Sequence, residues 1–282
     1  MAGETSSRVA VLMPAYNAGA CINQAVQSLV DGRYPCDVYI VDDGSSVPVA
    51  TILKAFPRTH VIRLERNGGL APALNAGLEV ILSGPYEFVA RLDADDIAHP
   101  DRILRQVEFF DRHPETAAVG TWGRHFAEGS GEMLCINRTP ANPVLVRKAM
   151  RYNSAIIHTS AMIRTSVLRA VGLYSESYPA AEDYELFRRI SKDFAIANIP
   201  SVLVDICISP EGVSLRRRRR QLYDRLRIQW KYLEPLKIGA WLGMAKTVAL
   251  FFAPTLLLSK IKSLNERRYN NATGLPLDEK RV

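Results

Sequence analysis

Short apolar runs alternate with stretches of helical periodicity through the first third of this 282-residue chain. A buried parallel strand is a continuous apolar run of about 4–8 residues, whereas an amphipathic helix repeats apolar side chains every three or four positions. Strands that alternate with helices predict an α/β fold with a Rossmann-like, mostly parallel sheet flanked by helices. The four predicted strands are Val9–Met13, Val38–Val41, His60–Leu64 and Tyr86–Leu92.

Polar clusters follow three of these four strands. Ligands of open α/β sheets bind at the carboxyl ends of the strands, so three clusters at one edge favour a ligand site over three independent turns. No GxGxxG or GxxxxGK[ST] sequence follows any of the strands, which argues against a dinucleotide-binding enzyme and a P-loop NTPase. The clusters contain Tyr16, Asn17, Asp42, Asp43, Asp93 and Asp95.

Three carboxylates lie within four residues directly after the fourth strand, in Asp93-Ala94-Asp95-Asp96. Such a cluster repels itself unless a cation neutralises it, and Mg²⁺ or Mn²⁺ prefers carboxylate oxygens and substrate phosphates. The alternative is an acidic turn in which Asp95 or Asp96 caps a helix that begins near Pro100.

The second half of the chain is less regular. An amphipathic helix follows Pro100, and a strand at 117–120 leads to a hairpin turn at 127–132. The remaining predictions are an extended segment at 156–164, a helix from Thr165 to Gly172, and final strands at 194–199 and 202–208.

Charge divides the chain into two parts. Residues 208–282 carry 16 Lys and Arg against 6 Asp and Glu, whereas residues 1–207 carry 20 against 23. A mildly acidic domain is therefore followed by a strongly basic region. Within it, five consecutive arginines, Arg216–Arg220, precede an apolar segment, and no nucleic-acid-binding motif accompanies them. This arrangement favours an anionic membrane surface as partner, with no nucleic acid.

The apolar segment at 238–258 contains one charge, Lys246, and one proline, Pro254. It is long enough to span a bilayer, but a central lysine costs about 2.5–3.5 kcal/mol there. Basic residues flank both ends, so peripheral or monotopic attachment, or a re-entrant bend, satisfies the positive-inside rule better than a crossing. The alternative is a hydrophobic helix packed on the catalytic domain.

Five short segments together resemble glycosyltransferase family 2. The resemblance covers about residues 8–205 and implies a GT-A fold, with a donor half at 1–100 and an acceptor half at 101–210. Beyond it we expect a basic and apolar helical membrane-association region at 211–265 and a polar tail at 266–282. The segments are Pro14-Ala15-Tyr16-Asn17, Val41-Asp42-Asp43-Gly44-Ser45, Asn67-Gly68-Gly69, Leu92-Asp93-Ala94-Asp95-Asp96 and Pro100-Asp101-Arg102.

The resemblance implies a function. It is the inverting transfer of a sugar from a nucleoside diphosphate sugar to a membrane-proximal glycan or lipid-linked acceptor, in polysaccharide or glycolipid biosynthesis. Mn²⁺ or Mg²⁺ is the implied cofactor, held by Asp95 with Asp93 nearby, and His158 matches a histidine found near the metal in some members. A half-buried histidine satisfied by a backbone carbonyl is the alternative for His158. The implied donor-binding residues are Pro14, Tyr16, Asn17, Asp42, Asp43, Arg66 and Asp93.

Glu182-Asp183 resembles the ED motif of the same family. The resemblance makes Asp183 the catalytic base that receives the proton of the acceptor hydroxyl, with Glu182 on the acceptor side. Two acids in the first turn of a helix are also favoured by the helix dipole, and both interpretations can hold at once.

Two other functions compete with this one. A sugar nucleotidyltransferase usually opens with a glycine-rich basic loop after its first strand, where this chain has Pro14-Ala15-Tyr16-Asn17. A catalytically idle membrane adaptor would be expected to lack the aspartate motif or the ED pair.

Four cysteines lie far apart without a CxxC pair, and the N-terminus lacks an apolar leader. We therefore expect a cytoplasmic protein attached to the inner face of the cell membrane.

Overall fold

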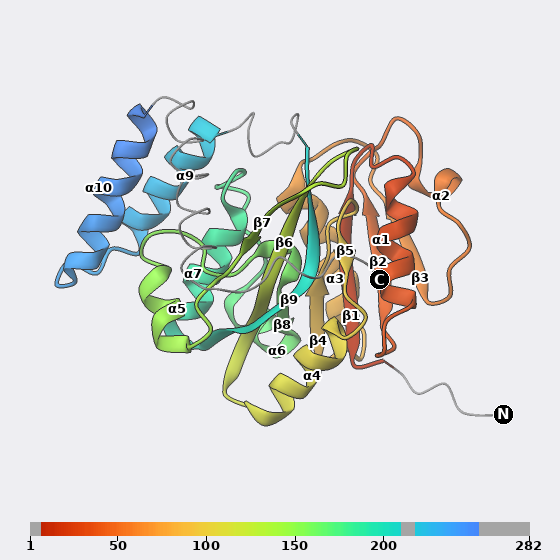
Figure 1. Cartoon of the computed structure of the whole chain (residues 1–282), viewed down its shortest axis with the longest axis horizontal. Helices are drawn as coiled ribbons and strands as arrows, with labels where there is room; N and C mark the ends of the chain where they lie inside the picture. Colours follow the sequence, from red (N-terminus) through yellow and green to blue (C-terminus); the bar gives the residue numbers. More distant parts are fainter. Residues whose placement is uncertain (1–6, 210–217, 254–282) are drawn as a thin grey trace.

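A computed structural model describes residues 7–209 and 218–253 of the chain. Within these residues, nine strands form one sheet in the order β3-β2-β1-β4-β8-β6-β9-β5, with β7 paired to β6 (Figure 1). The strands are β1 Val9–Ala15, β2 Asp37–Asp42, β3 Thr59–Arg63, β4 Phe88–Arg91, β5 Ile97–Ala98, β6 Thr116–Ala127, β7 Met133–Asn137, β8 Met162–Arg164 and β9 Ala195–Ile208. The helices are α1 Cys21–Val30, α2 Val49–Ile52, α3 Leu70–Ser83, α4 Arg102–Arg112, α5 Pro143–Ala149, the 3₁₀ turn η1 His158–Ser160, α6 Thr165–Val171, α7 Glu182–Asp193, α9 Arg218–Lys231 and α10 Ile238–Phe252.

Most strands of the sheet run in one direction. β1 pairs in parallel with β2 and β4, and β2 pairs in parallel with β3. β8 is antiparallel to both β4 and β6, so β6 has the direction of β4, and β9 is parallel to β6. The predicted α/β class with a mostly parallel sheet is therefore confirmed. The carboxyl ends of β1, β2 and β4 lie at one edge, as expected for a ligand site.

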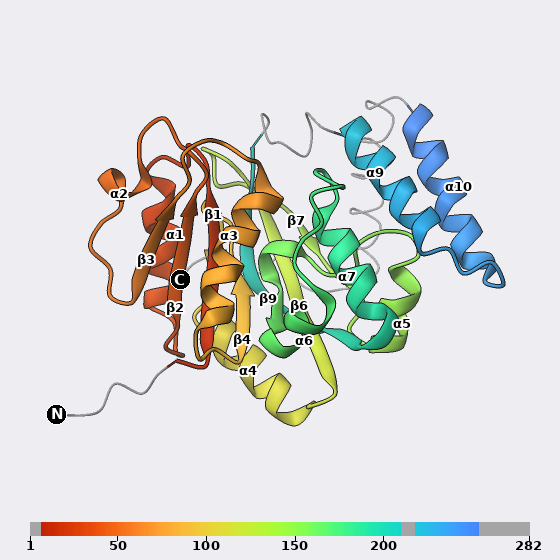
Figure 2. The ribbon, with the colours of Figure 1, turned by 180° about the vertical axis from the view of Figure 1, so that it is seen from behind.

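Helices cover both faces of the sheet. Figure 1 views the face covered by α1 and α4, where Phe110 of α4 stacks on Phe88 of β4 with ring centroids 4.7 Å apart. Figure 2 views the opposite face, covered by α3, α6 and α7. On that face a Cβ at Gly77 of α3 would lie 2.3 Å from a Leu12 methyl group, so glycine permits the close packing of α3 on β1.

β1 continues through Pro14 to Ala15, although Pro14 was expected to end the strand. The carbonyl of Leu12 accepts a hydrogen bond from the Leu92 N–H on the β4 side. Pro14 faces the same side two residues later, beyond the last residue of β1 that pairs with β4. A proline is tolerated there because the ladder needs no N–H at that position.

Two further predictions in the second half were wrong in detail. The strands expected at 194–199 and 202–208 form the single strand β9, and register shifts near Trp122 of β6 accommodate Pro200. The segment expected to be extended at 156–164 contains the turn η1 before β8. This turn is held by the Ser160 hydroxyl, which donates to the Ile157 carbonyl and accepts from the Thr121 N–H.

Of the last two described helices, α9 packs beside α7 and α10 lies on the far side of α9, as both views show (Figures 1 and 2). Ile228 of α9 is fully buried in the core that α7 shares, and the Gln229 amide donates to the carbonyls of Arg151 and Tyr152. α10 packs on α9, and a Cβ at Gly243 would lie 2.3 Å from the Arg151 carbonyl oxygen. The boundary at residue 210 stays a prediction.

None of the helices in the described part of the chain has both the length and the apolar character needed to cross a membrane. One face of α10 packs inward, while Trp241, Leu242 and Phe252 are exposed. Membrane attachment stays a prediction, and its residues 216–217 and 254–258 lie outside the described residues.

Candidate active site

The turn after β2 holds Asp42 completely buried. Its carboxylate accepts hydrogen bonds from the backbone N–H groups of Ser45 and Val49, both at 2.9 Å, and forms an ion pair with Arg63 at 2.5 Å. Burial opposes ionisation of this carboxyl, but these donors outweigh it and lower its pKa. Asp42 therefore fixes the turn as an ionised group, and its predicted contact with a nucleotide base stays a prediction.

Asp43 joins the β2 turn to the turn before α3. Its two carboxylate oxygens accept hydrogen bonds from the N–H groups of Gly68 and Gly69, at 2.8 and 2.9 Å. Gly44 has φ of 69°, and a Cβ there would lie 2.6 Å from the Arg66 carbonyl carbon. Only glycine fits this left-handed, closely packed position, and the packing holds exposed Arg66 at the rim of the site.

The loop after β1 is tied to the same turn. The Asn17 side-chain oxygen accepts hydrogen bonds from the Ser46 N–H and hydroxyl, and the Asn17 N–H donates to the Ser45 hydroxyl. Asn17 adopts φ of 52°, a left-handed conformation that asparagine tolerates. Tyr16 is left 53% exposed, while Pro14 is buried within β1. The predicted donor-binding residues 14, 16, 17, 42, 43 and 66 are thus assembled at one edge of the sheet.

The aspartates after β4 differ in exposure. Asp95 is exposed, the Asp93 side chain is 38% accessible, and Asp96 is buried. Desolvation, followed by repulsion from Asp93, raises the pKa of Asp95 to about 6, and burial raises that of Asp96 to about 8. One Asp96 oxygen accepts a hydrogen bond from the Cys207 N–H at 2.9 Å, so Asp96 ties this turn to β9. Asp96 does not cap α4.

Two buried arginines support the aspartates. Arg91, at the end of β4, forms an ion pair with Asp93 at 2.5 Å, and Arg102 of α4 donates to the Arg91 carbonyl at 2.5 Å. Sequence reasoning assigned neither of them to the site. The available signal was an arginine inside an otherwise apolar strand, because a buried arginine requires a charged or carbonyl partner.

His158 contacts a tyrosine, and the next residue, Thr159, accepts a hydrogen bond from the Asp93 N–H at its hydroxyl. Its Nε2 is 2.8 Å from the Tyr174 hydroxyl, and burial lowers its pKa well below the ordinary value, so the imidazole is neutral. Tyr174 is itself fixed by Asn75 of α3, whose side chain donates to the Tyr174 carbonyl and accepts from its N–H. The sequence left two expectations for His158, a hydrogen bond to a backbone carbonyl or a place near the metal. The structure gives it a hydrogen bond with the Tyr174 hydroxyl. Metal binding by His158 stays a prediction.

Glu182 and Asp183 begin α7, in the first turn. Burial, followed by repulsion from Asp183, raises the pKa of Glu182 to about 7. Burial also raises the pKa of Asp183, opposed by the Tyr184 N–H and by the charge of Arg225 on α9. The predicted base is therefore a desolvated carboxyl at a helix N-terminus, so the helix-dipole interpretation and the catalytic one can both hold.

Tyr174 connects the two acidic groups. Arg91, Asp183, Glu182 and Asp93 all act electrostatically on its hydroxyl, which burial keeps protonated by raising its pKa. The aspartates after β4 and the acids of α7, about 90 residues apart in the chain, therefore lie around one side chain. Tyr174 was missed from the sequence because no motif marks it.

Among the described residues, no group of three or more His, Cys, Asp or Glu side chains is placed to hold a metal ion. Mg²⁺ and similar cations usually take one or two carboxylates and complete their coordination with water and substrate phosphates. Asp93 and Asp95 offer this smaller donor set. The pair therefore fits a cation that arrives with a phosphorylated substrate.

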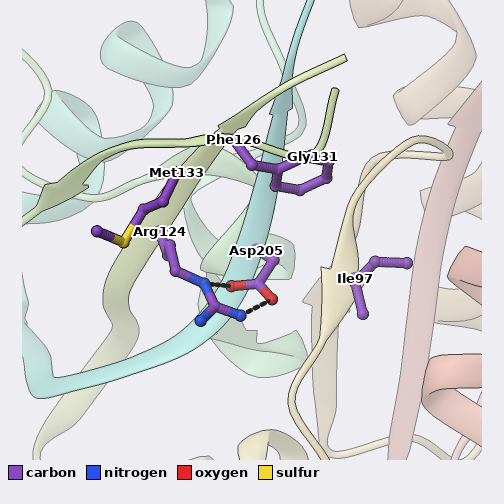
Figure 3. A pocket seen from close by; sticks show the side chains of 6 residues that line it. All are labelled: Ile97, Arg124, Phe126, Gly131, Met133 and Asp205. Atoms are coloured by element: carbon purple, nitrogen blue, oxygen red, sulfur yellow. Dashed lines mark hydrogen bonds and ion pairs between the residues drawn. The ribbon is translucent and has the colours of Figure 1, made fainter. Parts of the chain in front are cut away.

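A pocket of about 330 Å³ adjoins the aspartate turn, on the side of β5, β6, β7 and β9 (Figure 3). Arg124 and Asp205 form a bidentate pair inside it at 2.8 and 2.5 Å, and His99 contacts Asp205 at 3.1 Å. Burial opposes ionisation of Asp205, but these partners lower its pKa. Apolar side chains of Ile97, Phe126 and Met133 also line the pocket.

Comparisons with known proteins agree on one family. The profile described as Glycosyl transferase family 2 matches residues 10–172. The amylovoran biosynthesis glycosyltransferase AmsE of Erwinia amylovora is 32% identical over 73% of this chain and 79% of its own length. An Escherichia coli protein, the UDP-Gal:alpha-D-GlcNAc-diphosphoundecaprenol beta-1,3-galactosyltransferase, is 24% identical over 81% of this chain and 84% of its own length.

Solved structures show the same fold. The crystal structure of S. aureus TarS residues 1–349 in complex with UDP-GlcNAc has a TM-score of 0.62 at 19% identity, covering 86% of this chain and 71% of that chain. A mannosyltransferase from Pyrobaculum calidifontis in complex with GDP-Man and Mn²⁺ has a TM-score of 0.61 at 16% identity, covering 95% and 84%. At these identities the likeness concerns the fold alone.

Proposed function

Because this chain belongs to glycosyltransferase family 2, we propose that it transfers a sugar from a nucleoside diphosphate sugar to a lipid-linked glycan, with inversion. The observation that carries the proposal is the arrangement around the Tyr174 hydroxyl. Asp93 acts on this hydroxyl from the end of β4, and Glu182 and Asp183 act on it from α7. A donor diphosphate at the first group and an acceptor hydroxyl at the second would meet between them.

The strand ends supply the donor side. Tyr16 is exposed beside the turn fixed by Asp42 and Asp43, so its ring is available to pack on a nucleotide base. We assign Asp95 and Asp93 to Mn²⁺ or Mg²⁺, because their carboxylates repel each other and would be neutralised by a cation. Such a cation stabilises the negative charge of the departing nucleoside diphosphate.

Asp183 supplies the acceptor side. We assign it as the base that takes the proton of the acceptor hydroxyl, whose oxygen bonds to the anomeric carbon as the bond from that carbon to the diphosphate breaks. Burial raises the pKa of Asp183, which makes it a stronger base than an exposed aspartate. Glu182 lies beside it and stays mostly uncharged below pH 7, because its own pKa is about 7.

The lipid-linked acceptor is proposed from two lines of support. A 24% identical relative carries a diphosphoundecaprenol-linked sugar in its name, and AmsE is named for polysaccharide biosynthesis. The outer surface of α10 also exposes large apolar side chains, with Phe252 79% and Trp241 48% accessible, beside the basic α9. We infer that this surface rests on an anionic membrane and brings the active site to its acceptor.

A donor screen tests the activity. The full chain is incubated with UDP- and GDP-sugars, Mn²⁺ and a membrane lipid extract, and nucleoside diphosphate release is measured. We expect acceptor-dependent release with one donor and none from Asp183→Asn. Release of pyrophosphate would instead identify a sugar nucleotidyltransferase. No acceptor-dependent release from any donor would contradict the proposal.

Flotation with vesicles of phosphatidylcholine and phosphatidylglycerol tests the membrane surface. Replacing Trp241 and Phe252 together by Ser should leave only salt-sensitive binding, because the apolar burial is lost and the charge attraction remains. The matched control is Val144→Ser on α5, an equally exposed apolar residue, which should bind like the unaltered chain. Unchanged flotation of the double variant in high salt would refute membrane contact through α10.

A further inference from the structure

Arg225 lies on the face of α9 that packs against the protein. It is three residues after Leu222 and three before Ile228, both of which are buried, so the three share one helix face. Burial lowers the pKa of Arg225, and the nearby Tyr184 hydroxyl and Asp183 carboxyl act against this effect. The guanidinium is therefore held near the proposed base.

Most other cations of α9 have partners, and Arg219, which has none among the described residues, is exposed to solvent. Arg220 and Arg227 pair with Asp224, Arg227 also donates to the Ser177 carbonyl at 2.9 Å, and Lys231 pairs with Glu185 at 2.9 Å. Arg225, in contrast, forms neither a hydrogen bond nor an ion pair with any residue of the described ranges. The Arg225 side chain is half-buried and its guanidinium nitrogens reach solvent, so its five N–H donors are available to an anionic ligand.

The surroundings of Arg225 belong to the acceptor side. The Asp224 carboxylate accepts from the Ala180 N–H at 3.3 Å, so this turn of α9 covers the loop that leads into Glu182 and Asp183. The charge of Asp93 acts on Arg91, Tyr174 and Glu182, whereas Asp183 and Tyr184 are the acidic groups that act on Arg225. Arg225 therefore faces the loop and the first turn of α7 that carry Asp183, and Asp93 is not among the groups that act on it.

From these contacts we propose that Arg225 binds an anionic group of the acceptor, namely the phosphate that links its sugar to the lipid. The inference rests on the proposed function and adds the acceptor class that the site selects. A guanidinium matches phosphate oxygens with two parallel N–H donors, a geometry that lysine does not reproduce. The location also fits a lipid phosphate, because α9 lies between α7 and α10, whose outer face we assign to the membrane (Figure 1).

The test compares two acceptors that differ only in the anion. The full chain, with the donor that the screen selects, is given N-acetylglucosaminyl diphosphate decyl ester and the neutral decyl N-acetylglucosaminide. Arg225→Gln should raise KM for the diphosphate acceptor about 10- to 100-fold, the loss expected for a charge-assisted contact. KM for the neutral acceptor and for the donor should stay within about threefold of the unaltered values.

Two variants and one further acceptor complete the design. Arg112→Gln, which removes an exposed charge from α4, should leave all three KM values unchanged. Arg225→Lys should fall between the unaltered chain and Arg225→Gln. A decyl N-acetylglucosaminide that carries a C6 carboxylate tests whether Arg225 binds a carboxylate of the sugar instead of the linking phosphate. We expect Arg225→Gln to leave KM for this acceptor unchanged.

The outcomes separate the proposal from its premise. Equal losses of kcat with both acceptors would overturn it, because Arg225 would then act only by tuning Asp183. A raised donor KM would assign Arg225 to the donor diphosphate and would also overturn it. If the unaltered chain transfers to neither acceptor, binding of decyl diphosphate to the nucleoside diphosphate complex is measured by calorimetry, and equal affinity in Arg225→Gln refutes the proposal. Failure of the donor screen would count against the proposed function alone.

Discussion

The fold treats the acidic residues that end β2 and those that begin α7 in opposite ways. At the end of β2, Asp42 and Asp43 each accept hydrogen bonds from at least two backbone N–H groups, which fix the turns of the proposed nucleotide site. On the acceptor side, Glu182 and Asp183 are desolvated beside each other and their pKa values are raised. The turns after β2 are thus held rigidly, whereas the start of α7, like Asp95 after β4, keeps carboxyls whose ionisation is opposed. At α7 this raised basicity suits proton transfer.

The largest expected effect comes from the acceptor side. Asp183→Asn is close in shape to the native residue but cannot take a proton, so kcat should fall by roughly 10²- to 10⁴-fold. Donor affinity, measured by calorimetry with the nucleoside diphosphate and Mn²⁺, should not change. Near-normal turnover would move the base to another group, with Glu182 the first to test.

On the donor side, Asp95→Ala should remove the Mn²⁺-dependent part of donor binding. The loss of charge stabilisation on the leaving group should also reduce kcat by roughly 10²- to 10³-fold. Titration of the nucleoside diphosphate with and without Mn²⁺ measures the first effect. Metal-dependent affinity equal to that of the unaltered chain would exclude Asp95 as a ligand.

Asp42→Asn should destabilise the fold at pH 7 by about 1.5–3 kcal/mol, because charge-assisted hydrogen bonds are lost. The folded-state pKa of Asp42 is below its ordinary value. Its contribution is therefore fully present above the pKa of the unfolded chain and is lost as pH falls through the folded value. Thermal melts from pH 3 to 7 should show the two proteins converging at low pH, and a constant difference would contradict the mechanism.

Glu182→Gln should change the stability of the fold in the opposite direction. The folded-state pKa of Glu182, about 7, is above its ordinary value, so the ionised carboxylate destabilises the fold above pH 7, and this cost vanishes below the unfolded pKa. The variant should be more stable than the unaltered chain by about 1–3 kcal/mol at pH 8, with no gain at pH 4. A loss of stability at pH 8 would mean that the carboxylate is neutralised by a partner.

The fold and the donor edge could be predicted because their determinants are local. Apolar runs locate β1, β2 and β4, and the polar residues that follow them meet because parallel strands end at one edge. Two strands were predicted at 194–199 and 202–208 where the structure has one, since no local pattern reveals the register shift in β6 that accommodates Pro200 between them. Tyr174 and Arg225 were not predicted, since only tertiary packing brings them to Asp183.

The tail illustrates the same limit. Its composition predicted a basic, apolar extension, and α9 and α10 are helices with exposed apolar side chains. Composition does not report that Lys231 and Tyr232 bind the buried Glu185 carboxylate at 2.9 and 2.7 Å. These contacts depend on α7, which lies about 40 residues earlier in the sequence.

The two hydrogen bonds between Asn75 and the backbone of Tyr174 have a mechanical consequence. Asn75 belongs to the donor half and Tyr174 to the acceptor half, and the Thr165 hydroxyl adds a second tie, to the Tyr86 carbonyl at 2.8 Å. A hinge motion that separated the two halves would have to break these hydrogen bonds and the β4–β8 pairing together. These ties join the two expected halves into one frame, so the proposed donor would enter and leave past the loops at the rim of the site and not through separation of the halves.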